Sequence, residues 1–436
     1  MILEEQLSTP VAAPPAALLQ GLWSNLDQPL GHLFLQLLVI IAVSRLVGKL
    51  FTRIGLPEVV GEMTAGILLG PSLFGLLAPT AFAFIFPPDS LGALKLLAQV
   101  GICLFMFAVG MEVNLQQVRS SARTAVAVSQ ASIVVPFLFG VGLAYWLEEL
   151  AGPRATFIDF ALFMGISMSI TAFPVLARIL QERGLSRTPL GALAITCAAI
   201  NDVAAWAIMA FVVSIARSAS LGGAALTLVL ALVFIAVMTL AVRPALPRWL
   251  GAERLAREEP TSGTLATVVC VAIAAALCTE VIGIHALFGA FLAGTVMPDS
   301  AGFRDRINAY VERFSSVLLL PLFFAFTGLR TQIGLLGDLA GWALCLLIIA
   351  IATLGKLGAA AVAARLAGMA WRESLALGTL MNTRGLIELI ALNIGYDLGI
   401  LSPRVFTMLV IMALVTTVLT GPLLSWLGAR SQRAAA

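Results

Sequence analysis

An isolated acidic side chain lies deep inside a long apolar stretch of this sequence. Asp202 follows Asn201 in AITCAAINDVAAWAIMAF, and no basic residue lies within one helical turn of it. A bare carboxylate is strongly disfavoured at low dielectric, so this group must carry a proton or bind a cation. The alternative is a structural acid that is hydrogen-bonded to a neighbouring helix. We expect Asp202 to hold either H⁺ or a cation.

Two apolar segments contain residues that interrupt a helix. In SMSITAFPVLARIL, Pro174 removes a backbone donor and pushes the preceding residue towards an extended conformation. Within a membrane such a break needs compensation from water, from a ligand or from hydroxyl groups, here Ser167, Ser169 and Thr171. A simple proline kink is the alternative. The free carbonyls and hydroxyls of a broken helix can bind a desolvated monovalent cation.

The second such segment, MNTRGLIELIALNIG, has polar or flexible residues at its centre: Asn382, Thr383, Arg384 and Gly385. Two interrupted helices at corresponding positions indicate a binding site more firmly than either one alone.

Three further charged residues lie within apolar runs. Arg384 and Glu388 are four residues apart and share a helix face, which favours an internal ion pair. Alternatively, Arg384 supplies a fixed positive charge to the interrupted helices. Lys356 lies near Gly355 and Gly358, which allow another helix to approach closely. This lysine either extends to the membrane interface or pairs with Asp202 when no cation is bound.

Other polar residues have less specific interpretations. Glu58 and Glu62 lie one turn apart and are expected at the membrane interface or facing a second copy of the chain. His285 is expected to be packed and hydrogen-bonded, with pH sensing as the alternative. None of the five cysteines forms a C-x-x-C, so we expect no zinc site, no disulfide framework and no cofactor.

Composition identifies the elements that must position these residues. Of 436 residues, 60% are hydrophobic and only 11% are charged, which excludes a cytosolic enzyme, a nucleic-acid binder and a disordered scaffold. Membrane helices need ~20 largely apolar residues. About thirteen such runs predict an all-α integral membrane protein, and they occupy roughly 29–51, 56–77, 91–113, 122–147, 156–180, 189–216, 221–243, 263–282, 284–298, 314–330, 337–364, 371–396 and 403–428.

Basic residues orient these runs. With the N-terminus outside, 19 of the 26 lysines and arginines lie in loops on the inner side and five on the outer side. This bias predicts an outer N-terminus and a cytoplasmic C-terminus, most simply in a bacterial inner membrane. Residues 1–28 are then an extramembrane segment that lacks a signal-peptide pattern, and residues 429–436 form a cytoplasmic tail.

Two segments recur in the same order. VVGEMTAGILLGP in the second run matches LFGAFLAGTVMP in the ninth, and LFMFAVGMEV in the third matches LFFAFTGLRT in the tenth. These matches pair runs 1–6 with runs 8–13, and run 7 joins the halves. Because seven runs separate the partners, the halves are inverted, as in many secondary transporters.

Seven segments together resemble the cation/proton antiporter-2 family, and above all its Kef-type and plant or yeast cation/H⁺ exchanger-like members. They are LPEVVGEMTAGILLGPS, SITAFPVLARIL, IND, FGAFLAGTVMP, PLFFAFTGLRT, LGKLGA and MNTRGLIELIALNIG, and they cover nearly all runs between residues 40 and 425. The resemblance implies a homodimeric, elevator-type fold with two crossed broken helices. It implies a core at about 91–216 and 314–396 and a scaffold at about 29–77 and 221–298, with 403–428 a further candidate for the scaffold.

The same resemblance implies a role for individual residues. Asp202 would be the essential cation- and proton-binding acid, Asn201 its neighbour in the site, Thr171 a contributor from the broken helix, and Lys356 the candidate partner of Asp202. Electrogenic members carry Asp-Asp where this chain has Asn201-Asp202. One titrating acid predicts electroneutral exchange of one H⁺ for one Na⁺ or K⁺, although proton loss from Lys356 would add a second proton.

The expected function is therefore exchange of a monovalent cation for H⁺ by alternating access, and not catalysis. Kef-type members carry a nucleotide-binding domain after the last run, whereas this sequence ends soon after Trp426, so such regulation is not expected. A cation channel, an intramembrane protease and a non-transporting membrane sensor are the alternatives. The sequence has no TVGYG-like filter and no HExxH motif.

Overall fold

The computed structural model describes residues 28–112, 122–186, 188–217, 221–257, 259–299 and 302–428. These residues are almost entirely helical, and their only β-type pairing is the isolated bridge between Ala151 and Leu401. The predicted segments 1–28 and 429–436 lie outside the described residues, apart from Gln28.

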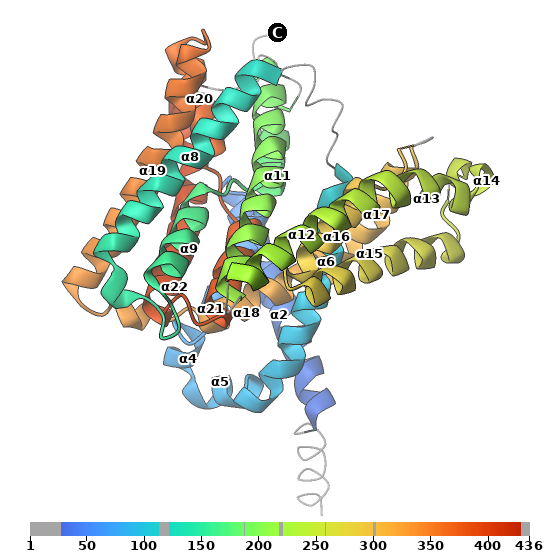
Figure 1. The fold of residues 1–436 in the computed structure, drawn as a ribbon. Coiled ribbons are helices and arrows are strands. Elements are labelled where there is room, and N and C mark those ends of the chain that lie inside the picture. Colours follow the sequence, from blue (N-terminus) through green and yellow to red (C-terminus); the bar gives the residue numbers. More distant parts are fainter. Residues whose placement is uncertain are drawn as a thin grey trace, which may run out of the picture.

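The helices follow the apolar runs closely (Figure 1). Their bounds are α2 Pro29–Arg53, α3 Glu58–Leu69, α4 Phe74–Leu77, α5 Pro79–Ile85, η1 Pro88–Ser90, α6 Leu91–Glu112, α8 Ala122–Trp146, η2 Glu148–Leu150, α9 Phe157–Ser169, α10 Phe173–Glu182, α11 Pro189–Arg217, α12 Leu221–Val237, η3 Met238–Val242, α13 Arg243–Leu250, α14 Ala252–Ala256, α15 Ser262–Ile282, α16 Ala286–Thr295, α17 Phe303–Phe314, η4 Ser315–Leu319, α18 Leu320–Arg330, η5 Ile333–Leu336, α19 Leu339–Leu366, α20 Trp371–Met381, α21 Leu386–Asp397 and α22 Pro403–Trp426. The elements η3 and η4 are π-helical, and the other three η elements are 3₁₀ turns.

The number of membrane spans agrees with the sequence in all but one run. Among the described residues, 11 helices are long and apolar enough to cross a membrane, or 12 when α20 and α21 count as one bent span. The run at 284–298 forms only the 10-residue helix α16, which is too short to be identified as a span by length. An integral membrane protein is therefore confirmed, and the exact number thirteen stays a prediction.

Side-chain caps fix where several of these helices begin. Thr156 and Asp159 form a capping box at the start of α9. Thr261, Asp338 and Ser402 each accept a bond from a backbone N–H in the first turn of α15, α19 and α22. These caps satisfy N–H groups that have no partner inside the helix. A short polar residue therefore marks the start of these four helices.

The recurring segments make equivalent contacts, as expected for an inverted repeat. At Gly66 of α3, an added methyl group would overlap the backbone of Phe324 in α18, and Gly328 lies equally close to the Gly66 backbone. In the other half, Gly294 of α16 lies against α6 at Gly110. The matched glycines thus exchange partners between halves, which is what two repeats related by a two-fold axis produce.

The helix contacts form two groups. In Figure 1, α8, α9, α19 and α20 of the first group lie on the left, and α15 and α17 of the second lie on the right. The crossing bundle, which we define as α8–α11 and α19–α22, is joined by contacts such as α8 with α9 and α19, α19 with α20 and α22, and α11 with α8 and α20. The flanking bundle, α2, α3, α6 and α15–α18, is joined by α2 with α3, α3 with α18, α6 with α16 and α15 with α16. Helix α12 contacts both α11 and α15 and so connects the bundles.

We name the two faces of the molecule after the residues at the two ends of α2. We call the face where α2 begins the Pro29 face and the opposite one the Arg53 face.

Candidate cation site

The first helix break lies between α9 and α10. Helix α9 ends at Ser169, residues 170–172 are not helical, and α10 begins at Phe173. Pro174 is the second residue of α10, a first-turn position at which a missing N–H removes no bond within the helix. The predicted interruption before Pro174 is therefore confirmed.

The second break lies between α20 and α21, at residues 382–385, and the two half-helices are bent by 43°. Gly385 lies close to the first broken helix, because a Cβ atom there would lie 3.0 Å from Cγ2 of Val175 in α10. A larger residue would require the Val175 side chain to shift.

The extended segments bond to each other where they cross. The Thr171 hydroxyl donates to the carbonyl of Met381, the last residue of α20, at 3.0 Å. The Ala172 N–H donates to the Thr383 carbonyl, also at 3.0 Å. Each broken helix therefore provides hydrogen-bond partners for the other, which supports the predicted pair of crossed broken helices.

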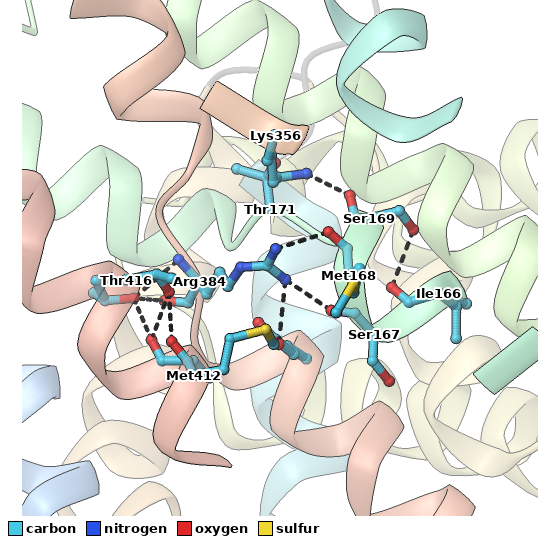
Figure 2. A network of polar contacts seen from close by, with 12 residues as sticks. Ile166, Ser167, Met168, Ser169, Thr171, Lys356, Arg384, Met412 and Thr416 are labelled. Carbon is cyan, nitrogen blue, oxygen red and sulfur yellow. Dashed lines mark hydrogen bonds and ion pairs between the residues drawn. The ribbon is translucent and has the colours of Figure 1, made fainter. Parts of the chain in front are cut away.

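Two cationic side chains cover the carboxyl end of α9 (Figure 2). The Arg384 guanidinium donates to the carbonyls of Ser167 at 2.7 Å and Met168 at 2.8 Å. The Lys356 ammonium donates to the Ser169 carbonyl, and to the Ser132 carbonyl at 3.1 Å. The last carbonyls of a helix lack partners within it and carry partial negative charge. Arg384 and Lys356 supply both the donors and the compensating charge.

The predicted ion pair between Arg384 and Glu388 is present, with 3.3 Å between Nη1 and Oε1, and both side chains are fully buried. Glu388 Oε2 and Arg384 Nε have no hydrogen-bond partner among the described residues. The pair holds the start of α21 against the end of α9. Both interpretations of Arg384 are thus consistent with one geometry.

Asn201 is bonded through both ends of its amide. Its Nδ2 donates to the hydroxyls of Thr171 at 2.8 Å and Ser132 at 3.0 Å, and its Oδ1 accepts from the Ser129 hydroxyl at 3.3 Å. Asn201 therefore joins α11 to the crossing and to α8. Ser129 and Ser132 had no place in the sequence analysis, although two serines three residues apart in an apolar run were a usable signal.

Asp202 is almost completely buried, with 1% of its surface exposed. Neither carboxylate oxygen has a hydrogen-bond partner among the described residues. The Phe173 N–H at the start of α10, the Lys356 ammonium and the Glu112 carboxyl act on it electrostatically. Buried polar atoms without partners are rare and call for an explanation. A carboxylate in this position has both oxygens available to a proton or a cation.

Lys356 forms no ion pair with Asp202 in this structure, since the described salt bridges of 4 Å or less do not include these two residues. Its ammonium bonds to backbone carbonyls instead. Ser169 likewise turns its hydroxyl back to the Ile166 carbonyl, at 3.0 Å. Asn382 Oδ1 and the Thr383 hydroxyl are buried without a partner at the crossing. The predicted site residues therefore lie together at the crossing, but Lys356 and Ser169 bond to backbone carbonyls and not to Asp202.

A cavity of about 750 Å³ lies between the bundles on the Arg53 face. It reaches Phe173, Pro174 and Leu386, the residues at which α10 and α21 begin. A second cavity of about 680 Å³ on the Pro29 face ends among residues such as Leu104, Ala290 and Ile394, away from both helix starts. Of these two cavities, the one on the Arg53 face borders the crossing.

The remaining candidates have structural partners. His285 precedes α16, and its Nδ1 accepts from the Leu287 N–H at 3.4 Å, as expected for a packed and hydrogen-bonded histidine. Glu58 and Glu62 both contact Arg45 of the same chain, at 3.0 and 3.4 Å. Their place at the membrane interface or facing a second copy stays a prediction.

Known proteins agree with this geometry. A family model described as "Sodium/hydrogen exchanger, transmembrane" matches residues 38–430. The Na⁺/H⁺ antiporter NhaS4 of Synechocystis sp. is 43% identical over 89% of this chain and 95% of its own length. The K⁺/H⁺ antiporter 1 of Saccharomyces cerevisiae is 33% identical over 92% of this chain. The Cation/H⁺ antiporter 17 of Arabidopsis thaliana is 37% identical over 95% of it. This chain spans about half the length of the plant and yeast relatives.

Among solved structures, the sodium proton antiporter MjNhaP1 of Methanocaldococcus jannaschii superimposes with a TM-score of 0.64 over 91% of this chain and 98% of its own. At 14% sequence identity, this likeness supports the fold alone. The family match covers the crossed broken helices and the buried acid together. The chain belongs to the sodium/hydrogen exchanger family, a family of membrane transporters and not of enzymes.

Proposed function

We propose that this protein exchanges a monovalent cation, Na⁺ or K⁺, for H⁺ across a membrane. The observation that carries the proposal is the Asp202 carboxylate, which is buried beside the crossing without a hydrogen-bond partner. Relatives named as Na⁺/H⁺ and K⁺/H⁺ antiporters support the same reaction. A channel is not favoured, because the cavities on the two faces share no lining residue.

The residues of the site have different roles in this exchange. Ionised Asp202 binds the cation, and protonated Asp202 returns without it. Helix α10 begins at Phe173, and the N-terminus of a helix carries partial positive charge. Asn201 acts by fixing the Thr171 hydroxyl at the crossing. Lys356, Arg384 and Glu388 compensate charge at the breaks, and Ser169, at the end of α9, is a further candidate ligand of the cation.

Exchange at one carboxylate replaces H⁺ by a cation of equal charge. Because Asn201 does not titrate, we propose a one-for-one, electroneutral cycle. Movement of one net charge would couple transport to voltage by about 2.3 kcal/mol per 100 mV, roughly a fiftyfold shift in the equilibrium ion ratio. An imposed potassium-diffusion potential in a Na⁺/H⁺ assay distinguishes the cases, since an exchange rate that follows voltage contradicts electroneutrality.

Alternating access follows from movement of the crossing bundle against the flanking bundle. The helix contacts support a division that differs from the sequence-based one at three helices: α6 and α18 group with the flanking bundle, and α22 with the crossing bundle. The cavity that reaches Phe173 makes this the state open to the Arg53 face.

We further propose that the Arg53 face is cytoplasmic, that the membrane is a bacterial inner membrane, and that the protein is a homodimer. The excess of basic residues in loops expected on this face supports the orientation. Leu30, Phe34 and Leu38 form an exposed apolar row on α2, in the flanking bundle, where a second copy can pack.

Reconstituted vesicles test the function. The wild-type protein is placed in vesicles with a pH gradient and a trapped pH dye, and Na⁺, K⁺, Li⁺ and Rb⁺ are added in turn. We expect Asp202→Asn to abolish exchange with every cation while eluting as the wild type does on gel filtration. Asp89→Asn, an equal charge change in the exposed turn η1, is the matched control and keeps wild-type exchange. Full exchange by Asp202→Asn contradicts the proposal, and flux without proton movement indicates a channel.

A further inference from the structure

The carboxylate of Glu58 links the two bundles at the Arg53 face. Glu58 is the first residue of α3, in the flanking bundle. Its Oε1 lies 3.0 Å from Arg45 Nη1 of α2, and its Oε2 lies 2.6 Å from Arg178 Nη2 of α10. One carboxylate therefore bonds to an arginine from each bundle, and each oxygen serves one of them.

The flanking side of this link is held firmly. The second nitrogen of Arg45, Nη2, donates to the Ser316 carbonyl at 2.9 Å. Ser316 lies in the π-helical turn η4, where carbonyls bond five residues ahead, and the fifth residue is Pro321, which has no N–H. The proline thus leaves this carbonyl free for Arg45. At Gly48 of α2, a Cβ atom would lie only 3.0 Å from Glu58 Cγ, so the glycine leaves room for the carboxylate.

The other side of the link belongs to the ion site. Arg178 is on α10, the half-helix that starts at Phe173 next to Asp202. Its Nε also contacts Glu182 at 3.2 Å, within the same helix. Arg178 therefore has one acidic partner across the bundle boundary and one on its own helix. Of the two, only the Glu58 contact resists displacement of α10 relative to α3.

We propose that Glu58 is a positioning residue that holds α10 against the flanking bundle while the site is open to the Arg53 face. It releases Arg178 when the crossing bundle moves. This inference rests on the proposed alternating-access exchange, and it adds to that function the contact that favours one of the two states.

The partial burial of these three side chains sets how strongly the Glu58 contact favours one state. The side chains of Glu58, Arg45 and Arg178 are 21%, 31% and 42% exposed, so water weakens the bonds without abolishing them. Exposed pairs contribute little, and charge-assisted bonds to buried groups contribute more. Between these limits, we expect loss of the link to change the ratio of the two states by about fivefold.

Chemical labelling measures that ratio. Ala177 lines the cavity of the Arg53 face, next to Arg178. In a background without the five native cysteines, Ala177→Cys is labelled by a membrane-impermeant maleimide only when this cavity is open. We expect Glu58→Gln to slow labelling about fivefold and to raise the apparent KM for the cation on that side, with a smaller change in maximal rate.

Glu182→Gln is the matched control, because it removes the same charge from the other partner of Arg178 and leaves the link intact. It labels at the wild-type rate. Arg178→Gln slows labelling as Glu58→Gln does, and the double variant is no slower than either one, because both changes break one contact. Glu58→Asp, which keeps the charge on a shorter side chain, restores at least part of the labelling rate and shows that the protein folds.

The outcomes separate this inference from the function beneath it. If the wild type exchanges ions, Asp202→Asn does not, and Glu58→Gln labels like Glu182→Gln, the link is not a positioning contact and only this inference is overturned. If Asp202→Asn exchanges ions, the proposed function itself is wrong. Equal slowing by Glu58→Gln and Glu182→Gln indicates a general charge effect and also overturns the inference.

Discussion

Replacement of Arg384 by methionine tests whether the crossing depends on the positive charge at the end of α9. The guanidinium contacts the carbonyls of Ser167 at 2.7 Å and Met168 at 2.8 Å, and Glu388 at 3.3 Å, without access to water. The methionine side chain is of comparable length and apolar. Arg384→Met therefore removes three polar contacts while leaving little empty space.

The expected loss is large and unequal between the two partners. Removal of one member of a buried ion pair costs about 3–5 kcal/mol because the other charge stays unpaired, and a charge-assisted bond contributes about 1.5–3 kcal/mol. Because these quantities overlap, we expect Arg384→Met to lower the free energy of unfolding by about 5 kcal/mol. Glu388→Met leaves both carbonyl bonds of Arg384 in place and should cost about 1–2 kcal/mol. The double variant should lose about 4 kcal/mol, a coupling of about 2–3 kcal/mol.

The assay is unfolding of the purified protein in mixed micelles with a rising fraction of denaturing detergent, followed by tryptophan fluorescence. If Glu388→Met lowers the free energy of unfolding at least as much as Arg384→Met does, the carbonyl contacts are not the main contribution of Arg384. Strict additivity of the two changes would show that the 3.3 Å ion pair contributes nothing.

Two other changes test the frame around the site. Lys356→Met removes the donor to the carbonyls of Ser169 and Ser132. It should lower the free energy of unfolding by about 3 kcal/mol and also slow exchange. A variant that is as stable as the wild type but inactive would indicate that Lys356 acts only on Asp202. Gly110→Ala places a methyl group against the α16 backbone and should lower the free energy of unfolding by about 1–3 kcal/mol in the same assay. Gly142 has open space around it, so Gly142→Ala should leave the stability unchanged. Equal effects of the two changes would contradict the close packing of the repeat contacts.

Local features of the site could be predicted from the sequence. Pro174 marked the first break, and the four-residue spacing of Arg384 and Glu388 gave their contact, because both follow from backbone rules that act within one segment. The matched glycines likewise indicated the repeat, since close helix packing requires small residues at fixed positions.

Contacts between distant segments could not be predicted in the same way. Lys356 was expected to extend to the membrane interface or to pair with Asp202. It is buried and bonds to backbone carbonyls, which every residue carries and which leave no signature in the sequence. The partners of Glu58 could not be predicted for a related reason. Its partners Arg45 and Arg178 lie 13 and 120 positions away, and only the packing of the bundles brings them to one carboxylate.

The covered end of α9 also bears on how the transported ion is hydrated. Each carbonyl from Ser167 to Ser169 already faces a guanidinium or an ammonium group, and that positive charge repels a further cation. These oxygens are therefore poor replacements for the ion's water shell. We therefore expect an ion at the proposed Asp202 site to retain several water molecules. A partly hydrated ion is sorted less sharply by radius than one held in a rigid cage of oxygens. Weak discrimination between sodium and potassium is the natural outcome of such a site.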